Sequence, residues 1–121
     1  MIEVAQVIHS FFSSFQIPAY LEENIPDDAE LPYITYSFSI PEWNEQTGLQ
    51  VRVWYEGSSV VPVFTKVDEI LNAVGYSGIS IPFDGGCVII YKDNPTVQLQ
   101  PYDSPDRDIK VAYLNLILVV N

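Results

Sequence analysis

The sequence contains little of what catalytic and metal-binding sites are usually built from. Its 121 residues include one cysteine, Cys87, and one histidine, His9. A lone cysteine cannot form an internal disulfide, and the chain has no Cys/His cluster for zinc. No nucleotide-binding fingerprint is present, and a Ser/His/Asp set is not credible with the only histidine in a predicted helix. We therefore expect a protein that is not an enzyme and that needs no cofactor.

Basic residues are also scarce, with 5 Lys and Arg against 16 Asp and Glu, which gives a net charge of −11. Charge of this sign and size opposes binding to the phosphates of nucleic acids and to anionic lipids. The bases are too scattered along the chain to form a nucleic-acid-binding patch: they are Arg52, Lys66, Lys92, Arg107 and Lys110. We expect neither specific nucleic-acid binding nor membrane association.

The first residues lack the basic region of a signal peptide. Together with the single cysteine, this predicts a protein that is made and kept in a reducing cytoplasm.

No hydrophobic run is long enough to span a membrane, which takes about 20 apolar residues. The most apolar stretch, residues 111–120, has one polar side chain, Asn115. Its Val, Ile and Tyr content favours a strand over residues 109–121 that lies centrally in a sheet and is covered on both faces. Such a strand would extend roughly 43 Å, more than most sheets require. We expect its ends, residues 109–110 and 119–121, to bend over the core or to reach a neighbouring subunit.

Two segments have helical spacing of their apolar residues. The first covers residues 2–15 and ends before Pro18. The second begins at Ser58 or Ser59 as the N-cap and ends at Gly75. Its predicted apolar face consists of Val63, Phe64, Val67, Ile70, Leu71 and Val74, and its predicted polar face of Thr65, Lys66, Asp68, Glu69 and Asn72.

Strict alternation predicts strands over residues 33–40 and 49–55, which we expect to form an antiparallel hairpin. Further strands are predicted at 79–81, 87–91 and 96–100, with a turn at 92–95 and a polar loop at 101–108. The fold class is therefore α+β, a single domain over residues 1–121 with one mainly antiparallel sheet and two helices packed on one of its faces.

Residues 19–32 form an acidic segment that contains no base, and we expect an irregular, solvated loop there. Its acids are Glu22, Glu23, Asp27, Asp28 and Glu30. Calcium binding is a lesser alternative, because the spaced ligands and central glycine of an EF-hand are missing. Catalytic carboxylate pairs also stay open, although every candidate acid lies in a predicted loop where solvated charge is the usual state.

The chain is charge-poor for a fully solvated surface, with 17% charged and 48% hydrophobic residues. Low charge with many aromatics is typical of a chain partly covered by another subunit. A compact monomer with a polar, uncharged surface is the alternative interpretation. The candidate interface residues are Trp43, Arg52, Trp54, Val119 and Val120. Trp54 and Arg52 share one strand face, so Arg52 could pair with an acid of the next subunit. Ordinary packing under a helix is the competing interpretation for each of them.

The order of elements resembles that of a known family. A helix is followed by the strand Leu-Pro-Tyr-Ile-Thr-Tyr (residues 31–36), the strand Val-Arg-Val-Trp-Tyr (residues 51–55), a second helix and paired strands. This resembles the small tail terminator, or tail completion, and minor capsid proteins of long-tailed bacteriophages. The resemblance covers nearly the whole chain in element order, but no interface residue of the family can be matched to this sequence.

The resemblance implies a structural, non-enzymatic virion protein. Such a protein would assemble with itself into a ring, typically a hexamer, on the end of the completed tail tube, and would offer a surface to the head connector. Its partners would be the tail tube protein and the head connector protein. Its location would be the tail or neck of the virion, after assembly in the host cytoplasm.

A second hypothesis concerns the acidic segment. An acidic binding module, such as a DNA mimic that inhibits a basic protein, would present these same five carboxylates to its target.

Overall fold

The computed structural model describes residues 2–40, 42–101 and 106–121. Within these ranges the chain forms two α-helices, one short 3-10 helix and six strands. In chain order the elements are α1 (Ile2–Ser13), β1 (Ala19–Leu21), η1 (Glu22–Asn24), β2 (Tyr33–Phe38), β3 (Gln46–Glu56), α2 (Val61–Val74), β4 (Ile79–Phe83), β5 (Gly86–Pro101) and β6 (Ile109–Val120).

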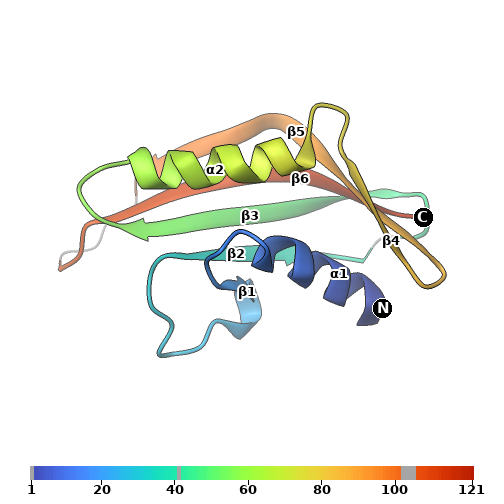
Figure 1. Cartoon of the computed structure of the whole chain (residues 1–121), viewed down its shortest axis with the longest axis horizontal. Coiled ribbons are helices and arrows are strands. Elements are labelled where there is room, and N and C mark those ends of the chain that lie inside the picture. Colours follow the sequence, from blue (N-terminus) through green and yellow to red (C-terminus); the bar gives the residue numbers. More distant parts are fainter. Residues whose placement is uncertain (1, 41, 102–105) are drawn as a thin grey trace.

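The strands form one curled sheet in the order β1-β2-β3-β6-β5-β4, with both helices in front of it (Figure 1). Every neighbouring pair is antiparallel except β1 and β2, which are parallel. The α+β class, the mainly antiparallel sheet and the two helices on one face are thus confirmed. The β2–β3 hairpin and the central position of β6 are confirmed as well.

The final strand β6 does not project beyond its sheet, so the expectation of surplus length is wrong. It pairs with β3 from Ile109 to Val119, and with β5 from Lys110 to Val120 around one bulge. The following residue, Asn121, exchanges two backbone hydrogen bonds with Cys87 at 2.8 and 2.9 Å. The length of β6 is matched by two unusually long neighbours, which the sequence pattern divided into shorter pieces.

The helices cover only one face of β6, which corrects the expectation of burial on both faces; on the other face, Val111 alone is buried. The side chains of Ala112, Leu114, Leu116, Leu118 and Val120 point toward the helices and are buried. The alternate residues from Tyr113 to Val119 are only half-buried. Half of the apolar surface of this strand is therefore left without a covering layer in the described part of the chain.

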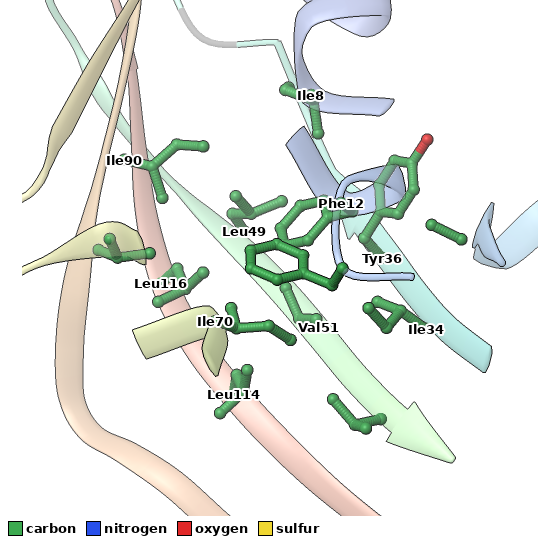
Figure 2. Packing of buried hydrophobic residues seen from close by; sticks show 14 of the residues in the cluster. Ile8, Phe12, Ile34, Tyr36, Leu49, Val51, Ile70, Ile90, Leu114 and Leu116 are labelled. Carbon is green, nitrogen blue, oxygen red and sulfur yellow. The ribbon is translucent and has the colours of Figure 1, made fainter. Parts of the chain in front are cut away.

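The core lies between the sheet and the two helices. Phe12 of α1 stacks on Tyr36 of β2 with ring centroids 5.2 Å apart, and Figure 2 shows it beside Leu49 and Val51 of β3. Ile70 of α2 lies near Leu114 and Leu116 in the same view. Each helix contributes its apolar stripe because spacing of three and four places these side chains on one side.

The second helix ends at the predicted Gly75, but its N-cap is Val60 rather than Ser58 or Ser59, which corrects that prediction. The backbone N–H of Val61 donates to Ser59 Oγ at 3.1 Å, and the N–H of Gly75 donates to the Leu71 carbonyl at 2.9 Å. Gly75 has a φ of +79°, which favours glycine.

Two residues of α2 are placed opposite to expectation. Phe64 is 38% exposed, whereas Lys66 is only 6% exposed. The Lys66 ammonium donates to the Phe15 carbonyl and to Glu69 Oε2, both at 2.6 Å. Lys66 is buried because a carbonyl just beyond α1, 51 residues away in sequence, supplies an acceptor that a helical pattern cannot reveal.

Two predicted irregular segments are regular. Residues 19–24, expected in an acidic loop, form β1 and η1, because β1 adds to the edge of β2. Residues 92–95, expected to turn, continue β5 with a register shift between Lys92 and Val97. A bulge absorbs the extra residues while the strand stays paired with β6. The predicted strands 79–81, 87–91 and 96–100 all lie within β4 and β5, and residues 102–105 of the predicted polar loop lie outside the described residues.

The different environments of Val119 and Val120 give a test of the placement of β6. Val120 is 1% exposed, so Val120→Ala should lower the free energy of unfolding by about 2 kcal/mol through lost burial and a residual cavity. The matched change Val119→Ala, on the half-buried side, should cost about 0.5 kcal/mol. Urea unfolding followed by circular dichroism measures both. Equal losses would contradict the assigned facing of the strand.

Candidate interaction surface

The sheet face turned away from the helices is the main candidate for a functional surface. Cross-strand partners point to the same side of a sheet, so the registers identify its members. We call this surface the open face. Its side chains include Tyr20, Tyr33, Thr35, Ser37, Gln46, Gln50, Arg52, Trp54, Glu56, Ser80, Pro82, Cys87, Ile89, Tyr91, Gln98, Ile109, Val111, Tyr113, Asn115, Ile117 and Val119.

A hydrogen-bonded chain of side chains crosses the open face from β3 to η1. Trp54 Nε1 donates to Thr35 Oγ1 at 3.0 Å, and Thr35 Oγ1 donates to Glu22 Oε1 at 2.8 Å. Arg52 Nη1 donates to the same carboxylate oxygen at 3.0 Å. Thr35 is fully buried beneath these groups. The chain fixes the orientation of the Trp54 indole and holds the charge of Arg52 next to an acid.

Aromatic rings surround this chain. The Arg52 guanidinium lies 4.8 Å from the centroid of the Tyr113 ring, a cation–π distance. The Tyr33 ring lies 6.1 Å from that of Trp54 and 5.7 Å from that of Tyr20. This end of the open face is therefore a layer of ordered aromatic rings, the residue type that is enriched at protein interfaces.

The charges at this end of the open face occur in pairs. Besides Arg52 with Glu22, Glu56 at the end of β3 accepts from Arg107 Nε and Nη2 at 2.9 and 3.0 Å. These hydrogen bonds from Arg107 hold the pKa of the Glu56 carboxyl below its ordinary value. The other open-face side chains are uncharged, so this surface has no net charge on a chain that carries −11.

The structure brings Arg52 and Trp54 together, as the sequence indicates, but their partners differ from those expected. Arg52 pairs with Glu22 of its own chain, so the expected pairing with an acid of the next subunit is not needed to satisfy it. Glu22 is half-buried rather than part of a solvated loop. The remaining acids of that segment, Glu23, Asp27, Asp28 and Glu30, are exposed as predicted.

Trp43 lies far from Trp54, at the opposite end of β3. It is 55% exposed, and its ring centroid is 6.4 Å from that of Phe83. A Cβ at Gly86 would lie 3.0 Å from the Trp43 ring and would collide with the Asn121 carbonyl. The loop before β3 and the turn between β4 and β5 thus meet at this end of the sheet. The two tryptophans cannot form one contact site.

The two valines proposed for an interface lie on opposite faces of the sheet. Val119 belongs to the open face and is half-buried, whereas the Val120 side chain belongs to the core.

The histidine has partners that the sequence does not reveal. His9 Nδ1 is hydrogen-bonded to the Tyr36 hydroxyl at 2.9 Å, and His9 Nε2 to Ser13 Oγ at 3.3 Å. Burial raises the pKa of Tyr36, so its hydroxyl stays neutral. A neutral phenol cannot stabilise an imidazolium as a carboxylate does, and this arrangement therefore lacks the electrostatics of a catalytic triad. His9 and Tyr36 border an open groove of about 420 Å³ between α1 and β1.

Within residues 2–40, 42–101 and 106–121, no group of three or more His, Cys, Asp or Glu side chains is placed so that it could hold a metal ion. No helix in these ranges is both long enough and apolar enough to cross a lipid bilayer.

Comparisons with known proteins add no identification. No model of a known protein family matches the chain, and a search of curated proteins also finds no match.

Thr35 is the joint of the hydrogen-bonded chain and gives the clearest test of it. Thr35→Val keeps the shape but removes the donor to Glu22 and the acceptor for Trp54, and should cost about 1–3 kcal/mol of unfolding free energy. Ser37→Ala, two residues along the same face of β2, is the matched control and should change it by less than about 0.5 kcal/mol. Urea unfolding followed by circular dichroism measures both. If both variants lost the same free energy of unfolding, the hydrogen bonds of Thr35 would contribute nothing to stability.

Proposed function

We propose that this protein is a structural component of a bacteriophage virion that caps the end of the tail tube as a ring of identical subunits. The single observation that carries the proposal is the open face, an ordered aromatic surface without net charge on a strongly acidic chain. A surface of this kind favours association with other protein surfaces over catalysis or nucleic-acid binding.

Element order supports the same proposal. The chain runs helix, short strand, hairpin, helix and three paired strands, which agrees with the order that the resemblance to tail terminator and tail completion proteins implies. The agreement supports the fold type; the biological role remains a proposal of its own.

The charge of the chain suits a ring through which DNA passes. Each copy carries −11, and the exposed acids between β1 and β2 have no base beside them in the sequence. If these loops line the lumen, they repel the phosphates of the passing DNA and prevent it from binding. The outer surface of such a ring would be free to contact the head connector protein.

The proposal is tested by adding the purified protein to uncapped tail tubes and imaging the mixture by electron microscopy. We expect density at tube ends only, and we expect tubes to stop lengthening when tube protein is supplied afterwards. Tubes incubated with an unrelated acidic protein of similar size are the control. Tubes that keep growing and carry no added density at their ends would refute the capping role.

A second candidate function is favoured by the four exposed acids Glu23, Asp27, Asp28 and Glu30. An acidic module that inhibits a basic protein would present them directly, and its binding would weaken steeply with salt. The variant Glu23→Gln, Asp27→Asn, Asp28→Asn, Glu30→Gln separates the two functions. Tube-end binding that survives in this variant excludes the acidic module, whereas a salt-sensitive complex with a nucleic-acid enzyme that this variant abolishes supports it.

A further inference from the structure

A second apolar surface lies on the helix side of the sheet. Five of the eight large apolar side chains that are exposed in the described part of the chain lie at the N-cap of α2, on α2 and on the second half of β5. We call them the helix-side patch: Val60, Val61, Phe64, Val97 and Leu99. Apolar side chains that gather on one surface, rather than scatter singly, mark a contact site.

The orientation of α2 turns Phe64 toward the β5 members of this patch. Lys66 donates to the Phe15 carbonyl just beyond α1, so that flank of α2 faces α1. Phe64 precedes Lys66 by two residues and therefore lies about 200° around the helix, on the flank that faces β5. Val97 and Leu99 pair with the buried residues Leu114 and Ala112, which places them on the helix side of β5.

The helix-side patch and the aromatic end of the open face lie at the same end of the sheet, on its two opposite sides. β3 ends with Glu56 paired to Ile109, and α2 begins a few residues later, so its first turn lies over this end (Figure 1). Trp54 pairs here with Val111, beside the pairing of Leu99 with Ala112. At this end of the subunit the helix-side patch is exposed on one side of the sheet. On the other side, which no helix covers, the aromatic side chains of the open face are half-buried.

The open face approaches the size that an interface requires. With strands about 4.8 Å apart and a rise of about 3.3 Å per residue, four strands over the six residues of β2 give roughly 19 by 20 Å, or about 380 Å² in projection. Side-chain relief raises the accessible area above this figure, toward the roughly 800 Å² per partner of a stable protein interface.

We infer that copies of this chain associate head to tail, with the open face of one copy packed against the helix-side patch of the next. The inference rests on the proposed ring and names its subunit interface. A second copy is the occupant because the charges of the open face are paired. The exposed acid Asp68, four residues after Phe64 on the same flank of α2, therefore meets no unpaired acid on that face. Two chains of −11 can approach here without placing unpaired acids against each other, whereas a basic partner would be drawn to the exposed acidic loops.

The presence of two different surfaces favours a head-to-tail contact over a twofold contact. A twofold contact would use one surface twice and leave the other uncovered on both copies. A head-to-tail contact covers both surfaces, and it produces a closed ring when the rotation between neighbours divides a full turn.

The test uses three double variants at exposed positions. Val61→Lys with Leu99→Lys blocks the helix-side patch, and Gln50→Lys with Gln98→Lys blocks the open face. Gln6→Lys with Asn72→Lys is the matched control outside both surfaces. Every variant gains two positive charges, so none increases repulsion between copies. Thermal unfolding followed by circular dichroism confirms that each is folded.

Sedimentation velocity and native mass spectrometry then give the oligomeric states. We expect rings from the wild type and the control, monomers from each blocked variant, and dimers that grow no further when the two blocked variants are mixed in equal amounts. A wild type that stays monomeric at its highest soluble concentration overturns the inference. Dimers formed by either blocked variant alone also overturn it, because they show a twofold contact.

This outcome is separable from that of the capping experiment. If rings form but do not bind tube ends, the proposed function is refuted and the interface is not. Tube ends capped by wild-type protein and by both blocked variants equally refute the interface and leave the function standing.

Discussion

The pairing of β6 with long strands on both sides is the constraint on which the rest of the structure depends. β3 and β5 follow it along its length, so the sheet is continuous from the aromatic end to the end that carries the chain terminus. Its side chains Leu114, Leu116 and Leu118 point toward the helices and are buried in the core beneath α2. Because side chains alternate in a strand, the same backbone necessarily presents an equally long row to the other side. The open face is thus a direct consequence of building the core on one central strand.

The orientation of α2 decides what the helix side of the molecule exposes. A lysine is rarely buried without partners, since its charge loses hydration. Here the ammonium of Lys66 donates to the Phe15 carbonyl, which holds this side of α2 toward α1, and to Glu69 of α2 itself. Phe64 is consequently turned toward β5 and remains exposed. The burial of Lys66 and the exposure of Phe64 thus have one cause, the rotation of α2 about its own axis.

The distribution of charge separates two kinds of surface on this acidic chain. Four acids of the segment between β1 and β2 are free in solvent, where hydration and counterions screen them. Arg52, one of only five bases, is placed beside Glu22 and over Tyr113 on the open face. Use of a scarce base to neutralise this surface leaves it open to a partner of the same charge.

The sequence by itself determined the elements whose signals are local. The apolar stripe and terminal glycine of α2, the alternation of β2 and β3, and the apolar run of β6 each depend on residues within a few positions, where helical or strand periodicity acts. The same patterns predicted Arg52 and Trp54 on one strand face. Only the tertiary structure decided the rest. The continuation of β5 through residues 92–95 required a long partner strand, and the contacts of Glu22 with Arg52 and of Lys66 with Phe15 join residues 30 and 51 positions apart. Such contacts depend on how the layers pack, which no local period encodes, and they determine which surfaces remain open to a partner.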